Sequence, residues 1–185
     1  HYGQIVLECT PAGRGTENTI EFEVTNDQIP AEFREAAEAG IRDGLLTGVV
    51  ANYPLIDLSV RVIGGRFHPV DSSEVAFRTA GVMALREAAQ KGRPVMLEPI
   101  MKVEVITPEE YLGDVLGDIN GRRGRIKDIE AQDVAQIIRA EIPLAALFGY
   151  ATGLRSLTKG RASYVMEPHS FEIVPDAIMA TLINR

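Results

Sequence analysis

The alternation of apolar and polar residues divides the chain into segments with two different periods. Apolar residues at every second position predict strands, and apolar residues three or four positions apart predict helices. In the first half of the chain these segments follow the order β-β-α-β-α. The predicted strands cover residues 4–10, 19–25 and 55–63, and the predicted helices cover residues 30–48 and 72–91.

A glycine-rich loop joins the first two predicted strands. It runs from Pro11 to Asn18 and carries Arg14 between two glycines. Two strands joined by a short glycine-rich loop commonly pair as a hairpin. We therefore predict a hairpin with an exposed, basic tip at Arg14.

A second loop, Gly64–Glu74, separates the third strand from the second helix. It combines two glycines, a proline and a helix N-cap, which predicts a tight loop with Phe67 and His68 at its apex. Asp71 is the predicted N-cap, and Glu74 stands three residues on, as in a capping box. Capping thus explains both carboxylates. The helix that follows is predicted to bury Val75, Val82, Met83, Leu85 and Ala89.

The second half of the chain reads β-α-β-β-α-β, the order of a ferredoxin-like domain. The two element orders predict an α+β protein with two domains, residues 1–97 and 98–174, with no flexible linker between them. The predicted strands cover 100–106, 125–128, 135–141 and 161–171, the helices begin at 107 and 142, and a terminal helix covers 177–183.

Composition limits the classes of function. The 185 residues are 45% hydrophobic, and no apolar run approaches the roughly 20 residues of a membrane span, so no membrane partner is expected. The net charge of −7 argues against a general nucleic-acid binder. No metal-binding or nucleotide-binding spacing occurs, so neither a metal nor a cofactor is expected in this segment.

The single cysteine and the start of the chain bear on its context. Cys9 lies in an apolar strand and is predicted to be a small strand residue. As the single cysteine of the chain, it excludes an intrachain disulfide and fits a reducing cytoplasm. The chain opens without Met, directly in a β pattern, which suggests a piece of a longer protein.

A basic cluster lies at a predicted helix-to-strand junction, between Gly121 and Lys127. Flanking glycines and arginines suit contact with phosphate. The same run also fits a solvated turn neutralised by Asp128, Glu130 and Asp133. The cluster comprises Arg122, Arg123, Arg125 and Lys127, and a second group comprises Arg155, Lys159 and Arg161.

A catalytic interpretation would combine His68 with Asp71 and with Ser72 or Ser73 as a nucleophile. All of these residues come from one short loop, and both serines suit the first turn of a helix. A stand-alone hydrolase is therefore the disfavoured alternative, and no catalytic residue is assigned.

Five runs along the chain carry a family resemblance: His68–Glu74, Leu97–Glu104, Gly113–Asp118, Arg122–Gly124 and Phe148–Tyr164. They resemble the C-terminal part of bacterial translation elongation factor G, and the resemblance covers essentially the whole chain. It implies domains IV and V of a translational GTPase. GTP and magnesium are then expected in a G domain outside this fragment, and the fragment itself is not expected to be an enzyme.

The resemblance also implies a fold and a set of partners. It implies a ribosomal-protein-S5-domain-2-like module with a left-handed βαβ crossover, then a ferredoxin-like module, with the terminal helix 175–185 packing back on the first. The first module would enter the decoding region of a cytoplasmic ribosome and promote mRNA–tRNA translocation. The second would contact the large subunit near the stalk base. Expected partners are rRNA, the tRNA–mRNA duplex, stalk-base proteins and the N-terminal domains of the same chain, in a monomeric factor.

Residue roles follow from the same resemblance. The implied tRNA- and mRNA-contacting tip is Arg66, Phe67, His68, Pro69, Val70 and Asp71. The implied companion loop beside it includes Pro11, Gly13, Arg14 and Gly15. The implied rRNA contacts are Arg122, Arg123, Arg125, Lys127, Lys159 and Arg161.

Two departures from the family pattern keep alternatives open. Arg66-Phe67 replaces the usual Ser-Tyr before the tip histidine, and Pro69 replaces the usual Asp after it. A paralogous or recycling-specialised relative of elongation factor G fits these changes. A binding module of the same fold without a ribosomal role is a third possibility.

Overall fold

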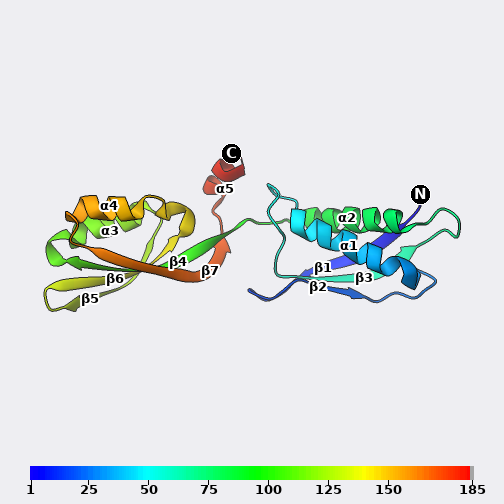
Figure 1. Cartoon of the computed structure of the whole chain (residues 1–185), viewed down its shortest axis with the longest axis horizontal. Coiled ribbons are helices and arrows are strands. Elements are labelled where there is room, and N and C mark those ends of the chain that lie inside the picture. The colour runs from blue at the N-terminus through cyan, green and yellow to red at the C-terminus, as the bar shows by residue number, and fades with distance from the viewer. Residues whose placement is uncertain (184–185) are drawn as a thin grey trace. The chain divides into compact units, whose positions relative to one another are not determined.

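The computed structural model describes residues 1–183, which form two compact units, each with its own sheet and helices (Figure 1). The α+β prediction with two sheet-containing modules is confirmed. The units divide between Pro94 and Val95, a few residues before the predicted boundary at 97. The terminal helix α5 covers Asp176–Ile183, and residues 184 and 185 of the predicted terminal segment lie outside the described residues. Its packing against the first unit stays a prediction.

In the first unit, two long helices lie side by side against a three-stranded sheet (Figure 1). The core forms where the helices meet the central strand, with Val60 and Val62 packed against Ile41 and Phe77. All four side chains are fully buried. The elements of this unit are β1 (Gln4–Pro11), β2 (Thr19–Phe22), α1 (Ala31–Thr47), β3 (Leu58–Arg66) and α2 (Glu74–Lys91).

The predicted hairpin is wrong, because β1 and β2 are not neighbours. The strand order is β1-β3-β2, with β3 antiparallel to β1 and parallel to β2. The loop after β1 is held at the start of β3 instead, where the Gly15 N–H donates to Asp57 Oδ1 at 3.1 Å and the Asn18 amide donates to the Leu55 carbonyl at 2.8 Å. β2, α1 and β3 thus form a parallel crossover unit, whose handedness stays a prediction.

The buried face of α2 also differs from the prediction. Leu85 and Ala89 are buried as expected, but Val75 and Met83 are 70% and 65% exposed. Phe77 is buried in their place and stacks on Phe33 with a ring-centroid distance of 5.0 Å. Apolar residues occur on several sides of this helix, so their spacing alone does not identify the face that meets the core.

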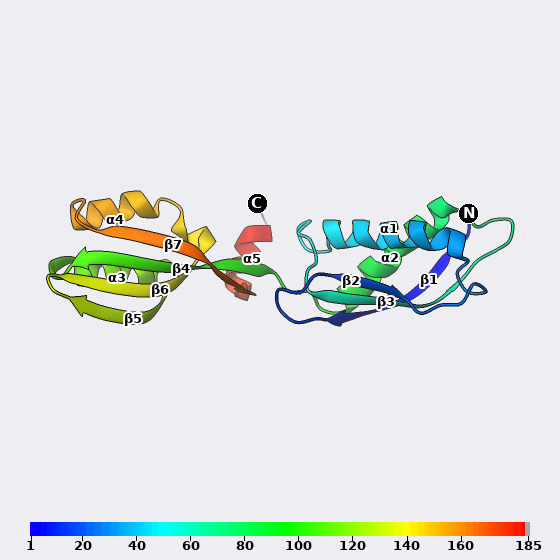
Figure 2. The same ribbon diagram turned by 60° about the horizontal axis from the view of Figure 1, so that its bottom comes forward.

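The second unit has the ferredoxin-like topology that the sequence predicts. Its four strands follow the order β5-β6-β4-β7, all neighbours being antiparallel (Figure 2). Side chains of α3 and α4 share a core with β4 and β6. The elements are β4 (Leu97–Pro108), a 3₁₀ turn (Glu109–Tyr111), α3 (Leu112–Gly121), β5 (Arg125–Gln132), β6 (Ala135–Pro143), a 3₁₀ turn (Leu144–Leu147), α4 (Tyr150–Thr158) and β7 (Ser163–Ile173).

The helix predicted to start at 142 is misplaced. Only a 3₁₀ turn follows Pro143, and α4 begins at Tyr150, after Gly149 in the left-handed conformation at φ 70°. Phe148 precedes α4 and is 84% exposed. Pro143 does precede a turn, but the longer helix α4 starts only after Gly149.

Tyr150 gives a test of the packing in this second core. Its ring packs edge-on against Tyr164, whereas its buried hydroxyl has no hydrogen-bond partner within residues 1–183. Burial raises the pKa of Tyr150 to about 12. Since an unpaired buried hydroxyl is costly, Tyr150→Phe is expected to leave the free energy of unfolding unchanged or raise it by up to about 1 kcal/mol.

Denaturant unfolding of the second unit measures this effect. Tyr150→Leu is the control, because it removes the ring together with the hydroxyl and is expected to destabilise by about 2 kcal/mol or more. A loss of more than about 1 kcal/mol in Tyr150→Phe would show that the hydroxyl makes a stabilising bond.

Candidate nucleic-acid interface

The predicted tip forms an exposed loop between the end of β3 and the start of α2. β3 extends through the two glycines to Arg66, beyond its predicted end at 63. Val70 is 83% exposed, and the His68 side chain is 52% exposed. Arg66, Pro69 and Asp71 are exposed as well. We name residues Arg66–Asp71 the tip loop.

Phe67 is the exception among the tip residues. It is only partly exposed and packs against the core cluster that contains Ile29 and Phe77. The structure thus uses the aromatic ring to anchor the tip loop, and the ring is not presented for stacking on a base. The other five residues of the tip loop are all exposed.

The start of α2 differs from the predicted capping. The N-cap is Ser73, whose Oγ accepts a hydrogen bond from the Ala76 N–H at 3.1 Å, and Glu74 is the first helical residue. Asp71 is therefore not the cap, and Glu74 is not three residues beyond one. Ser72, Ser73 and Asp71 are all good capping residues, so the sequence leaves the choice among them open.

Ser72 braces the tip loop. Its Oγ accepts a hydrogen bond from the His68 N–H at 2.8 Å and donates one to the Tyr2 carbonyl at 2.8 Å. The Ser72 N–H donates to the His68 carbonyl at 3.1 Å, and the Tyr2 N–H donates to the Asp71 carbonyl at 2.8 Å. These bonds connect both ends of the loop to each other and to the segment before β1.

The imidazole of His68 folds back over its own loop. Its Nδ1 lies 3.2 Å from the Val70 amide nitrogen and 3.3 Å from that of Asp71, and both N–H groups donate to it. The same Nδ1 lies 3.4 Å from Asp71 Oδ2. The Nε2 side of the ring makes no hydrogen bond within residues 1–183.

This geometry does not support the hydrolase alternative. Neither Ser72 nor Ser73 places its hydroxyl on the His68 ring: the first bonds to backbone, and the second caps α2 and lies 3.4 Å from His1 Nδ1. A nucleophile needs a base within hydrogen-bond reach of its oxygen. His68 is also exposed instead of enclosed in a pocket.

The companion loop lies at the opposite end of β3 from the tip loop. In the antiparallel β1–β3 pair, Pro11 is opposite Leu58, whereas Gln4 is opposite Arg66. The predicted adjacency of Pro11, Gly13, Arg14 and Gly15 to the tip is therefore wrong. The segment that does lie beside the tip is His1–Gly3, which the sequence pattern did not single out because the partners are about 70 residues apart in the chain.

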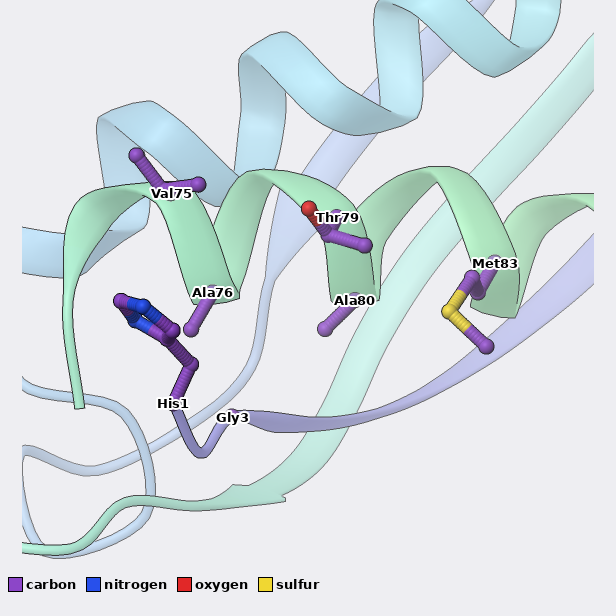
Figure 3. Close-up of a pocket in the computed structure, with 7 residues that line it drawn as sticks. All are labelled: His1, Gly3, Val75, Ala76, Thr79, Ala80 and Met83. Carbon is purple, nitrogen blue, oxygen red and sulfur yellow. The ribbon is translucent and has the colours of Figure 1, made fainter. Parts of the chain in front are cut away.

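A shallow, mainly apolar hollow runs along the exposed side of α2 near the same segment (Figure 3). It is formed by His1 and Gly3 on one side and by a row of α2 side chains on the other. The exposed Val75 and Met83 belong to that row. The α2 residues of the hollow are Val75, Ala76, Thr79, Ala80 and Met83.

The structure does not bring the predicted basic cluster together as one patch. Arg122 donates to Asp118 and to the carbonyls of Ala146 and Phe148, and its guanidinium lies 5.0 Å from the centroid of the Tyr150 ring. Its side chain is only 19% exposed. Arg122 is thus a structural link between α3 and the segment before α4.

The other members of the cluster also have carboxylate partners. Arg123 binds Glu98 through both terminal nitrogens, and Arg125 binds Glu141 and Glu172. Hydrogen bonding to Glu172 raises the pKa of Arg125. The predicted neutralisation of the cluster by Asp128, Glu130 and Asp133 is wrong. Asp128 and Glu130 bind Arg139 instead, and Asp133 forms no ion pair with the cluster within residues 1–183.

The remaining predicted rRNA contacts differ in availability. Lys127 lies 3.9 Å from Glu141, and Arg161 binds Glu110 beside the Tyr111 ring. Lys159 is exposed, at the end of α4, and forms no ion pair within residues 1–183. Of the six predicted residues, Lys159 is thus the one whose charge is most available to a partner.

Within residues 1–183, no group of three or more potential metal ligands converges. None of the helices in that range is both long and apolar enough to cross a bilayer.

Partial burial raises the pKa of the Cys9 thiol, which disfavours the nucleophilic thiolate form.

The fold and the tip define a two-module α+β protein of the translation-factor type, with an exposed loop mounted on its first module. The chain belongs to the elongation factor G family. The model of elongation factor G domain IV matches residues 1–93, and that of the elongation factor G C-terminus matches residues 95–182.

A solved structure supports the same relationship. The chain is similar to a protein from Thermus thermophilus, with 34% sequence identity and a TM-score of 0.82. The match covers 97% of this chain and 27% of that protein. The chain thus spans about a quarter of the length of this relative.

Proposed function

We propose that this chain is the ribosome-contacting C-terminal part of a translocase of the elongation factor G type. The tip loop enters the decoding region of the small subunit and promotes movement of the tRNA–mRNA duplex. The observation that carries this proposal is the tip loop itself, which is exposed at His68 and Val70 and yet fixed in place. Four hydrogen bonds hold it: two are made by the Ser72 hydroxyl, and two join backbone groups. A preorganised loop loses little conformational entropy on binding.

The second unit is proposed to contact the large subunit. Lys159 is its best-supported rRNA contact, because its charge is exposed and unpaired within the described part of the chain. The partners are rRNA, the tRNA–mRNA duplex and stalk-base proteins of a cytoplasmic ribosome, and the factor acts as a monomer. GTP and magnesium bind a G domain in another part of the parent chain, so hydrolysis does not depend on residues described above.

His68→Ala in the full-length factor is expected to slow mRNA–tRNA translocation about tenfold, the effect of losing one well-placed hydrogen bond. Ribosome-stimulated GTP hydrolysis is expected to stay near the wild-type rate, since the G domain is separate. Rapid mixing with a fluorescent mRNA measures the first quantity, and phosphate release measures the second.

Arg14→Ala is the matched control, because Arg14 is also an exposed loop residue but lies at the other end of β3. It is expected to leave translocation unchanged. Equal slowing by both variants would mean that the tip loop has no special role. Normal translocation with His68→Ala would reject the proposal.

A further inference from the structure

We infer that the tip loop fixes His68 in the neutral tautomer with its proton on Nε2, so that the tip presents a hydrogen-bond donor. The group that it binds is then an acceptor, a phosphate or ribose oxygen of the RNA backbone. The identity of this ligand rests on the proposed function. The tautomer itself rests only on the geometry of the loop.

The first step of the argument is the environment of Nδ1. Two backbone N–H groups, those of Val70 and Asp71, donate to this nitrogen at 3.2 and 3.3 Å. A proton on Nδ1 would point at both of these hydrogens. A neutral imidazole has one donor and one acceptor nitrogen, so an accepting Nδ1 places the proton on Nε2.

The second step concerns Asp71, which is the one competing partner. Its carboxylate lies 3.4 Å from Nδ1 and would favour a proton there. Both side chains are more than half exposed, at 52% and 61%, so water screens this attraction. The other titratable residues in or beside the loop, namely His1, Tyr2, Arg66 and Glu74, make no hydrogen bond to the ring within residues 1–183. The two backbone donors therefore decide the tautomer.

The third step is the role of Ser72, which we identify as a positioning residue. The backbone turn that aims the Val70 and Asp71 N–H groups at Nδ1 is closed by the Ser72 hydroxyl, between the His68 N–H and the Tyr2 carbonyl. Loss of this hydroxyl would remove two of the four hydrogen bonds that hold the loop and leave the two backbone–backbone bonds. The neighbouring Ser73 caps α2 through the Ala76 N–H and plays no part in the turn.

The fourth step identifies the chemistry of the ligand. With Nδ1 occupied from within the loop, Nε2–H is the ring's remaining polar group, and it can only donate. Phosphate and ribose oxygens accept hydrogen bonds and carry no base sequence, which suits a factor that must act on every codon.

Nitrogen-15 NMR of the 185-residue chain tests the tautomer directly. Long-range proton–nitrogen correlations of His68 are expected to show a protonated Nε2 and a bare Nδ1. Ser72→Ala is expected to shift the ring toward the tautomer mixture of a free histidine, while Ser73→Ala and Asp71→Asn leave it unchanged. A protonated Nδ1 in the wild-type chain, or a change of tautomer in Asp71→Asn, would overturn the inference.

Two substitutions in the full-length factor test the ligand. Asparagine can place an acceptor near the position of Nδ1 but has no donor near that of Nε2, whereas glutamine can place a donor near Nε2. His68→Asn is therefore expected to slow translocation about tenfold, and His68→Gln no more than about threefold. The reverse order, or wild-type speed with asparagine, would reject a donor role.

These outcomes separate the inference from the proposed function. Normal translocation in all His68 variants, with the tautomer as expected, would reject the proposed function and the RNA ligand but leave the positioning role of Ser72 established. Slow translocation in His68→Ala with the opposite tautomer would support the proposed function and reject the inference.

Discussion

Gly40→Ala is expected to lower the free energy of unfolding of the first unit by about 3 kcal/mol, the upper part of the range for overpacked cores. A Cβ added at Gly40 of α1 would lie 2.0 Å from the Arg78 carbonyl oxygen of α2. The contact is reciprocal, because a Cβ at Gly81 of α2 would lie 2.6 Å from the Ala37 carbonyl oxygen. Since the obstructing atoms are backbone, no side-chain rotation relieves the clash, and the helices must separate.

Guanidinium unfolding followed by amide exchange measures this loss, with amides of α1 reporting on the first unit and amides of α3 on the second. Two units need separate probes, because one global signal would mix their transitions. Gly117→Ala in α3 is the control: apart from its chain neighbours and the backbone of its own helix, no atom of residues 1–183 lies within 4 Å of its added Cβ. This variant is expected to gain about 0.5–1 kcal/mol from the better helix propensity of alanine. Wild-type stability of Gly40→Ala would show that α1 and α2 can move apart without cost.

Another glycine of α1, Gly44, shows what the sequence could and could not predict about the helices. Apolar spacing identified the range of α1 almost to the residue, including its end at Gly48. Within that range, propensity treats Gly44 as a weak point. In the structure a Cβ at Gly44 would meet the Leu85 side chain at 2.7 Å, so this glycine also allows the close approach of α2. Local propensity cannot report contact with a helix about 40 residues away.

Strand pairing was predictable in one unit and not in the other. In the second unit, β5 and β6 are joined by a short turn and do pair as neighbours. The order β-α-β-β-α-β predicted the ferredoxin-like topology that this sheet has. In the first unit, β3 pairs between β1 and β2. The loop after β1 has hairpin composition, but its contacts are with Leu55 and Asp57, which follow α1 in the chain. Loop composition specifies a turn and not the partner of the strand that follows.

The exposed loop between β3 and α2 was predicted from the sequence, but its internal contacts were not. His68 is exposed in this loop, at the end of β3 where Arg66 pairs with Gln4. The roles of Phe67 as an anchor and of Ser72 as a brace depend on Ile29, Phe77 and Tyr2, which are remote in sequence. Such contacts follow from tertiary structure, so the exposed residues of a loop are easier to predict than the residues that hold it.

The basic cluster shows the converse, since neighbours in sequence diverge in space. Arg123 adopts the left-handed conformation at φ 61°. Around this turn Arg122 is directed to Asp118, Arg123 to Glu98, and Arg125 to Glu141 and Glu172. Counting charges along the chain therefore overestimates the positive field that a phosphate would meet.

Arg123→Ala is accordingly expected to destabilise the second unit by about 2–3 kcal/mol, somewhat below the usual cost of breaking a fully buried ion pair. The Glu98 side chain is only 8% exposed, and that of Arg123 is 30% exposed. Removing the guanidinium leaves a buried carboxylate without a counter-charge. Denaturant unfolding, with amide exchange in β4 as the local probe, measures the loss.

Lys159→Ala is the matched control for that substitution. Lys159 is also basic and also left-handed, at φ 51°, so alanine meets a similar backbone cost at both positions. Without a carboxylate partner in residues 1–183, Lys159→Ala is expected to cost less than about 1 kcal/mol. The double variant Arg123→Ala with Glu98→Gln should recover part of the loss, because it removes the stranded charge. Equal stabilities of the Arg123 and Lys159 variants would instead assign Arg123 to a surface role, and its place among the rRNA contacts implied by the family resemblance would then be restored.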